Sequence, residues 1–235
     1  MPRSLLKPAL FFDFDNTLTH GDVLDELIER HSPNEAWRDW ENAWEQGRLA
    51  ARECLRLQVE NMRVTPEQLL ADVARVRIDP AFADIVHWAR RHDVAVRIVS
   101  DSFLPLIACI LDANGIEGIP VFANELAFAP GGRLVPSFPY HEPASSCSAN
   151  AKARHLAPHR ARHRIIFAGD GHSDLDAALA ADVVFAKSTL ARELDARGVA
   201  FYPFETLDNV LAFLETVSLP GPERSLAAAN RLDAK

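Results

Sequence analysis

Residues 10–19 read LFFDFDNTLT, three large apolar residues that run directly into two acids. An apolar run that ends abruptly in carboxylates indicates a buried parallel strand whose carboxyl end opens onto a site. Because side chains alternate along a strand, Asp13 and Asp15 are expected on the same side and Phe14 on the other. Two carboxylates held together repel each other unless a cation or a proton lies between them. A turn with capping acids is the alternative interpretation of this pair, so the rest of the chain has to decide.

The composition indicates a globular protein without a nucleic-acid-binding surface. With 235 residues, the chain can form one large domain, or a core domain with a smaller insert. Apolar residues make up 48% and charged residues 25%, which are the proportions of an ordinary soluble protein. The net charge of -8 argues against a nucleic-acid partner, because such a surface needs clustered lysines and arginines to neutralise phosphates.

Three further features predict a cytoplasmic protein with no membrane partner. No apolar run reaches the roughly 18 residues that a transmembrane helix needs. The first residues, MPRSLLKPALFF, lack the longer apolar core and the cleavage site of a signal peptide. The three cysteines, Cys54, Cys109 and Cys147, form neither a metal-binding pattern nor a disulfide framework, which suits a reducing cytosol.

Residues 20–91 are almost wholly helical in pattern. Ser32–Glu35 (SPNE) and Thr65–Gln68 (TPEQ) each place a capping residue, a first-turn proline and a Glu or Gln as a capping box does. Asp79 followed by Pro80 gives another helix start. The expected helices are 22–31, 33–46, 50–62, 66–76 and 80–92. We therefore predict an all-helical cap at 21–78, an α/β core formed by 1–20 and 79–220, and a loose tail at 221–235.

Tryptophans form a stripe on the second of these helices. Trp37, Trp40 and Trp44 are spaced i, i+3 and i+7, which places them on one helix face. Core packing is the ordinary role of such a stripe. The alternative is that it lines a substrate pocket beneath a lid.

Strands and helices alternate after residue 92, which predicts a doubly wound parallel sheet. A buried strand at 94–99 ends in Ser100-Asp101-Ser102, and another at 164–168 ends in GDGHSD at 169–174. Ligands of such sheets bind outside the carboxyl ends of the strands, so these polar clusters should meet the acids that follow the first strand. The remaining expected elements are a helix at 103–114, a strand at 119–123, a hairpin of 126–128 with 133–135, a loop at 136–149, a helix at 151–157, a helix at 174–180, a strand at 183–186, a helix at 188–197 and a strand at 199–202.

The residues expected to converge carry a recognisable chemistry; they are Asp13, Asp15, Ser100, Lys152, Asp170 and Asp174. Four acids in one place require a hard divalent cation, and oxygen ligands without His or Cys favour Mg²⁺ over Zn²⁺. Lys152 and Ser100 supply donors suited to a phosphate group. One carboxylate can act as a nucleophile and form an acyl phosphate, while a second transfers protons.

The motifs DFDNT at 13–17, Ser100, Lys152 and GDGHSD at 169–174 resemble the four ordered motifs of the haloacid dehalogenase superfamily of phosphatases. The resemblance implies an α/β core with an all-helical type-1 cap inserted after the first strand. It implies that Asp13 is the nucleophile and Asp15 the general acid and base, with Ser100 and Lys152 binding the phosphoryl group. Mg²⁺ would be held by Asp13, the Asp15 carbonyl and Asp170, supported by Asp174. We also expect Asn16, Thr17, Asp22 and Asp101 to bind substrate or phosphate.

Three segments, VSDSF at 99–103, FANELAF at 122–128 and SSCSANAKARHL at 145–156, are similar to the methylthioribose-salvage branch, which hydrolyses 2-hydroxy-3-keto-5-methylthiopentenyl-1-phosphate. They are also similar to phosphoethanolamine and phosphocholine phosphatases. The cysteine-rich loop of the salvage enzyme is reduced here to Cys147. Asp22 falls where phosphoserine phosphatase carries a Glu that binds the substrate amine, although an acid near a helix N-terminus is an equal interpretation.

The expected function is therefore that of a Mg²⁺-dependent phosphoric monoester hydrolase acting on a small phosphorylated metabolite through a phospho-aspartate. The salvage ester, phosphoserine and phosphoethanolamine or phosphocholine are the candidate substrates, and the chain is compatible with a homodimer. A phospho-accepting regulatory domain is the alternative from a different class, but a general base beside the nucleophile and a helical insert both argue against it. Substrate contacts of His20, His141, Glu142, His172 and Lys187 stay open.

Overall fold

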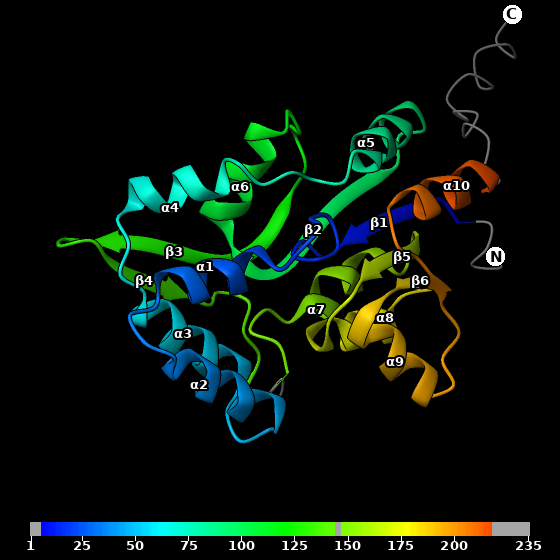
Figure 1. The fold of residues 1–235 in the computed structure, drawn as a ribbon. Coiled ribbons are helices and arrows are strands. Elements are labelled where there is room, and N and C mark those ends of the chain that lie inside the picture. The colour runs from blue at the N-terminus through cyan, green and yellow to red at the C-terminus, as the bar shows by residue number, and fades with distance from the viewer. Residues whose placement is uncertain (1–5, 144–146, 218–235) are drawn as a thin grey trace, which may run out of the picture.

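The computed structural model describes residues 6–143 and 147–217, and it contains a seven-stranded sheet of order β4-β3-β2-β1-β5-β6-β7. All neighbouring strands are parallel except β3 and β4. β1 lies at the centre and pairs with β2 and β5 (Figure 1). The strands are β1 (Pro8–Phe12), β2 (Ala95–Phe103), β3 (Val121–Ala129), β4 (Arg133–Ser137), β5 (Arg164–Gly169), β6 (Val183–Ala186) and β7 (Tyr202–Pro203).

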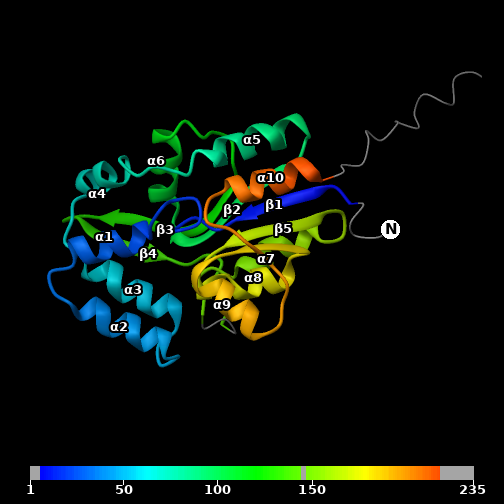
Figure 2. The ribbon, with the colours of Figure 1, turned by 45° about the vertical axis from the view of Figure 1, so that its right-hand side comes forward.

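Helices cover both faces of this sheet, which confirms the doubly wound α/β architecture. One face packs against α5 (Ala81–Arg91), α6 (Leu104–Ala113) and α10 (Asp208–Thr216), and the other against α7 (Lys152–Leu156), α8 (Leu175–Ala180) and α9 (Ser188–Ala196) (Figure 2). The short 3₁₀ helices Ala157–His159 and His172–Asp174 complete the second layer. Because β1 is buried on both faces, all five of its residues are buried.

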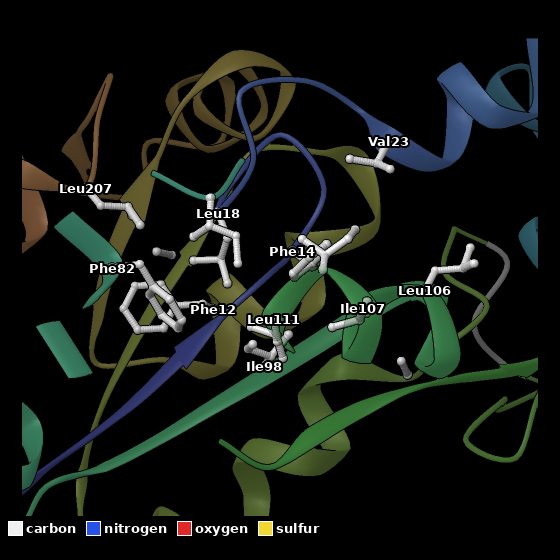
Figure 3. Close-up of a cluster of buried hydrophobic side chains, with 14 of the residues drawn as sticks. Phe12, Phe14, Leu18, Val23, Phe82, Ile98, Leu106, Ile107, Leu111 and Leu207 are labelled. Carbon is white, nitrogen blue, oxygen red and sulfur yellow. The ribbon is translucent and has the colours of Figure 1, made fainter. Parts of the chain in front are cut away.

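The loop that follows β1 is anchored by apolar side chains. Phe14 and Leu18 are fully buried, and the ring of Phe12 meets that of Phe82 edge-on at 5.4 Å. Figure 3 shows Leu18 beside Phe12 and Phe82, with Leu207 above them. Phe14 therefore enters the core while the acids on either side of it are free to face elsewhere, as strand alternation predicts.

The helical insert begins directly after this loop. It comprises α1 (Val23–His31), α2 (Ala36–Glu45), α3 (Ala51–Asn61) and α4 (Pro66–Val73). Figure 1 shows α1 and α3 next to the β3–β4 hairpin, with α3 against β4 and α2 packed on α3, whereas α4 packs on α6. A backbone bridge between Thr19 and Ile78 joins the two chain segments that enter and leave the insert.

Several expected elements are wrong in detail. The strands expected at 119–123 and 126–128 are one strand, β3, and the strand expected to end at residue 99 continues to Phe103. The capping box at Ser32 is absent because Ser32 ends α1, and the Oδ1 atom of Asn34 accepts instead from the amide of Ala36, 3.1 Å away.

Other expectations hold, and one helix was missed. The Thr65–Gln68 capping box is confirmed. Helix α10 was not predicted, and the strand expected at 199–202 is reduced to β7. None of the helices in the described ranges is long and apolar enough to cross a bilayer. The tail expected at 221–235 lies outside the described residues.

Candidate active site

The carboxyl ends of β1, β2 and β5 meet around a cavity of about 160 Å³. Parallel register places Phe12 opposite both Ile98 and Ala168, so the residues that follow the three strands are neighbours. The backbone amide of Asp13 continues this pairing with a 2.9 Å hydrogen bond to the carbonyl of Ala168. The expected residues on the cavity surface are Asp13, Asp15, Asp22, Ser100, Asp101, Lys152 and Asp170.

Lys152 connects the first motif to the last. Its Nζ atom donates to Asp13 Oδ1 at 2.7 Å, to Asp174 Oδ1 at 2.6 Å and to Ser173 Oγ at 3.1 Å. Burial opposes the ammonium charge, but the carboxylates of Asp13 and Asp174 prevail and raise the pKa of Lys152 well above its usual value. Lys152 therefore stays positively charged at the floor of the cavity, within reach of an anionic group.

Asp174 holds the turn of the GDGHSD motif in place. The side chain is fully buried, and its Oδ2 atom accepts from the amides of Asp170 and Gly171 at 3.0 Å each. A Cβ atom on Gly169 would lie 2.6 Å from the same oxygen, so only glycine leaves room for this contact. The motif thus presents Asp170 to the cavity in a fixed orientation.

The loop after β1 is bonded directly to Asp170. Asn16 donates through Nδ2 to Asp170 Oδ2 at 2.6 Å, and Thr17 donates through Oγ1 to Asp170 Oδ1 at 3.4 Å. Asn16 has a φ of 51°, in the left-handed region that an Asn adopts more readily than most residues. The side chains of Asn16 and Thr17 thus bind the acid of the fourth motif, and their expected contact with substrate or phosphate stays a prediction.

Three of the acids form a cluster that fits a divalent cation. Asp13, Asp170 and Asp174 each offer one carboxylate oxygen, and these atoms lie within 4.8 Å of one another. Burial, then repulsion by Asp174, raises the pKa of Asp13 despite the opposing charge of Lys152, and the same two causes raise the pKa of Asp170 to about 6. A cluster of oxygen donors whose own charges repel is suited to Mg²⁺.

Asp15 lies on the same cavity but has a different environment. Its Oδ1 atom accepts a 3.1 Å hydrogen bond from the amide of Val23, at the start of α1. Burial, followed by repulsion from Asp22, raises the pKa of Asp15 to about 8, although hydrogen bonds from Ser102 and Val23 oppose the shift. Near neutral pH Asp15 therefore carries a proton that it can donate, whereas Asp13 is bonded to an ammonium group.

The two expected residues at the end of β2 have unlike partners. The Oγ atom of Ser100 accepts from the amide of Ser102 at 3.0 Å, so its own hydrogen can be donated into the cavity. The carboxylate of Asp101 accepts instead from the Ser148 hydroxyl and from the amides of Ala149 and Asn150, at 2.7–3.0 Å. Asp101 borders the cavity, but its carboxylate is occupied by the segment that leads to Lys152.

A family model described as haloacid dehalogenase-like hydrolase matches residues 10–179. The chain belongs to this family. It is 27% identical to the polyol phosphate phosphatase PYP1 of Saccharomyces cerevisiae, covering 91% of this chain and 95% of that protein. It is also 27% identical to the 2-hydroxy-3-keto-5-methylthiopentenyl-1-phosphate phosphatase of Lysinibacillus sphaericus, covering 89% and 95%. The resemblance to the haloacid dehalogenase superfamily is thereby confirmed.

Solved structures support the fold of this haloacid dehalogenase-like chain. A phosphoserine phosphatase described as a phospho-aspartyl intermediate analogue superimposes with a TM-score of 0.68 at 18% identity, covering 88% of this chain and 99% of that one. A similarity at this level of identity establishes the shared fold.

The side of the cavity contributed by the helical insert contains residues that sequence reasoning missed. Besides Asp22, it presents Asp25 and Glu41, and we call these three residues the cap acids. Asp22 caps α1 by accepting from the amide of Asp25 at 2.9 Å, so its expected capping role is confirmed together with its place on the cavity. The i, i+3 spacing of Asp22 and Asp25 is the signal that could have placed Asp25 there.

The tryptophans of α2 take both of the expected roles, core packing and lining of the cavity. Trp37 packs against the main apolar cluster, whereas Trp44 lines the cavity with its ring centroid 6.1 Å from that of His172. His172 also borders the cavity and is bonded to Glu193. The cavity lining contains none of the other residues whose substrate contacts were left open, namely His20, His141, Glu142 and Lys187.

Proposed function

We propose that this chain is a Mg²⁺-dependent phosphomonoesterase that hydrolyses a small phosphorylated metabolite through a phospho-aspartate on Asp13. The observation that carries the proposal is the contact of Lys152 with Asp13 inside a cavity that also contains Asp15 and Asp170. Relatives named as phosphatases that span nearly the whole chain support it.

The first step is the attack of an Asp13 carboxylate oxygen on phosphorus. The bond between phosphorus and the ester oxygen breaks, and protonated Asp15 gives its proton to the departing alkoxide. Lys152 and Ser100 donate hydrogen bonds to the phosphoryl oxygens while their charge changes. In the second step, Asp15 takes a proton from water, the water oxygen attacks phosphorus, and the bond to Asp13 breaks to release inorganic phosphate.

The expected cation site includes the nucleophile Asp13. Asp13, Asp170 and Asp174 provide the oxygens that would hold Mg²⁺, with the Asp15 carbonyl as the further ligand that we expect. When bound, Mg²⁺ would neutralise negative charge on the phosphoryl group and favour the ionised form of Asp13. Without a cation, burial and Asp174 raise the pKa of that nucleophile.

The direct test compares two isosteric substitutions of buried aspartates. Asp13→Asn should abolish hydrolysis of p-nitrophenyl phosphate in the presence of Mg²⁺. Asp79→Asn is the matched control, because Asp79 is also buried but bonds only the backbone amides of Ala81 and Leu207, away from the cavity. Wild-type rates for Asp13→Asn would overturn the proposal. A phosphoprotein that survives for hours would instead favour the phospho-accepting regulatory domain, in which Asp15 would have no task.

The cap acids support a substrate that offers hydrogen-bond donors and has no carboxylate. Among the described residues on the cavity, Lys152 is the one lysine and there is no arginine, so a carboxylate near the insert would meet three acids and no lysine or arginine. Desolvation raises the pKa of Asp22 and of Asp25 to about 7, with further repulsion of Asp22 by Asp25 and of Asp25 by Glu41. Hydroxyl or ammonium groups would relieve that repulsion, as in a polyol phosphate or phosphoethanolamine.

Phosphoethanolamine and phosphoserine form a matched pair of substrates for this point, since they differ by one carboxylate. We expect kcat/KM for phosphoethanolamine and for glycerol phosphate to exceed that for phosphoserine. The methylthio-salvage ester belongs in the same assay, with released phosphate as the readout. A preference for phosphoserine would overturn the proposed substrate class and leave the phospho-aspartate mechanism intact.

A further inference from the structure

Asn150 is fully buried beside the last residues of β2 and the first residues of β3. Its Nδ2 atom donates to the carbonyl of Ser100 at 2.9 Å and to the carbonyl of Phe122 at 2.8 Å. The pairing of β2 with β3 shifts register between Val99 and Phe103, which interrupts the regular ladder at this point. The side-chain amide of Asn150 thus supplies donors to one carbonyl from each of the two strands, next to the irregular part of their pairing.

His155 fixes the orientation of that amide. Both hydrogens of the Asn150 amide are used, so its Oδ1 atom must accept, and His155 Nε2 lies 2.8 Å from it. His155 must therefore carry its proton on Nε2. The imidazole stacks on Phe122, with ring centroids 4.6 Å apart, and meets Tyr140 edge-on at 4.7 Å. Burial, then Arg154, lowers the pKa of His155 to about 4, which keeps the ring neutral near neutral pH.

Asp101 holds the same segment from the other side. The Asp101 carboxylate accepts three hydrogen bonds from residues 148–150, and the backbone carbonyl of Asp101 accepts from Asn124 Nδ2 at 2.6 Å. Residue 151 follows, and α7 begins at Lys152. The two groups that would bind the phosphoryl group, on Ser100 and Lys152, therefore lie on segments that Asn150 and Asp101 bond together.

We propose that Asn150, oriented by His155, is a positioning residue that sets Ser100 and Lys152 at the separation a phosphoryl group requires. The inference rests on the proposed function, because those two residues act only if a phosphoryl group is bound. Asn150 itself does not line the cavity. Asp101 strengthens the same connection, and we call Asn150, His155 and Asp101 the Asn150 clamp.

The test replaces the amide by a carboxylate of the same shape. Asn150→Asp places an acceptor against the carbonyls of Ser100 and Phe122, and kcat should fall by about 100-fold, the loss expected when catalytic groups are displaced by about 1 Å. Asn114→Asp is the matched control. Asn114 also donates to two carbonyls, of Val76 and Ile110, but lies away from the cavity. Circular dichroism and thermal unfolding of both variants give the folded fraction at the assay temperature.

A double substitution separates positioning from loss of folded protein. Ser100→Ala should lower kcat by about 100-fold in the wild type, as removal of one transition-state donor does, but by less than about 10-fold in the Asn150→Asp background. Partial unfolding would leave the two effects independent. Independent effects, or equal rates for Asn150→Asp and Asn114→Asp, would overturn the proposal.

Two milder variants keep the test decisive if Asn150→Asp does not fold. His155→Leu removes the donor to Asn150 and should slow the enzyme several-fold, whereas His155→Gln can restore a donor and should recover most of the rate; equal rates for the pair would overturn the clamp. If the wild type hydrolyses no ester, the proposed function fails. The clamp is then judged on calorimetric binding of inorganic phosphate with Mg²⁺, which Asn150→Asp must weaken more than Asn114→Asp does.

Discussion

The two sides of the cavity hold their charges in different ways. On the sheet side, Asp13, Lys152 and Asp174 are at most 5% exposed and are bonded to one another at 2.6–2.7 Å. On the side of the helical insert, Asp22 and Asp25 have exposed side chains, and their carboxylates are not paired with any cation among the described residues. Buried charges that are held in place by hydrogen bonds suit a reaction that needs exact placement of a few atoms. Open, unneutralised charge suits recognition of a group that the substrate brings.

The comparison assigns rate to the sheet side and selectivity to the insert. Reacting atoms must be held within a fraction of an ångström, and buried hydrogen-bonded side chains supply that rigidity. Selectivity depends on the difference in binding free energy between two substrates. Acids that repel one another until a hydrogen-bond donor binds can therefore discriminate between substrates with and without such a donor. Substitutions on the two sides should consequently change different kinetic parameters.

After the loss of the nucleophile Asp13, the largest effect should come from Asp15, which lies where the two sides of the cavity meet. Asp15→Asn should lower kcat by about 10²–10⁴-fold, because an amide cannot exchange a proton with the leaving group. The loss should be greater for an alkyl phosphate than for p-nitrophenyl phosphate, whose leaving group needs little protonation. Steady-state kinetics with both esters measure this, and Asp25→Asn provides the same substitution among the cap acids. Equal losses of kcat/KM for the two esters would contradict the role of Asp15 as an acid, because kcat/KM does not include the second step that both esters share.

The second-largest difference should be in Mg²⁺ dependence, which substitutions on the sheet side should change and substitutions in the insert should not. Asp170→Asn removes one oxygen of the acid cluster and should raise the Mg²⁺ concentration needed for half-maximal activity by at least about 10- to 100-fold. The chelator EDTA should inactivate the wild type, and Mg²⁺ should restore it. Calorimetric titration with Mg²⁺ gives the affinity without turnover. Glu41→Gln should leave that affinity unchanged, so an equal loss in both variants would place the cation elsewhere.

The sheet side was largely predictable from the sequence because its residues follow apolar strands. Asp13, Ser100 and Asp170 each come where a buried strand ends or nears its end, and parallel strands bring such positions to one edge. The partners of these residues were not predictable. The role of Asp101 depends on residues 148–150, and that of Asn150 on a local shift of strand register, neither of which leaves a periodic signal.

The helices of the insert were predictable from the sequence, but the residues that it contributes to the cavity were not. Its capping box at Thr65 identified one helix start, yet the place of Glu41 on the cavity follows from how α2 packs on α3, which sequence periodicity does not fix. Outside the insert, α10 was missed although Val210 and Leu214 have the i, i+4 spacing of a helix face. Tertiary packing, rather than local propensity, decided these features.

Substitution of Glu41 should change substrate preference without changing the rate of the catalytic steps. Glu41 Oε2 accepts from Gln58 Nε2 at 2.8 Å, a contact that a glutamine oxygen can keep. Glu41→Gln should lower kcat/KM for phosphoethanolamine by about 10-fold, near the lower end of what hydrogen bonds to charged groups contribute. The rate with p-nitrophenyl phosphate should stay at the wild-type value. A parallel loss with both substrates would show that Glu41 supports the fold of the cavity rather than selecting the substrate.

The smallest effect concerns stability and follows from the charge left open on α1. Although the side chain of Asp25 reaches solvent, the surrounding protein partly desolvates it, and this desolvation, followed by the charge of Glu41, raises the pKa of Asp25 to about 7. Between about pH 4 and pH 7 the folded protein therefore binds a proton that the unfolded chain has already released, so the contribution of Asp25 to stability declines as pH rises through this window. Asp25→Asn removes that decline.

The variant should consequently unfold at the wild-type temperature near pH 4 and about 2 °C higher near pH 8, a small shift because the exposed side chain is partly screened by solvent. Thermal unfolding at the two pH values measures it. A gain of equal size at both would mean that asparagine acts through the helix backbone, since only a titrating charge makes the difference depend on pH. A gain in unfolding temperature only at high pH would show that the negative charge of Asp25 destabilises the free enzyme. A substrate that brings a hydrogen-bond donor or a cation would relieve this destabilisation.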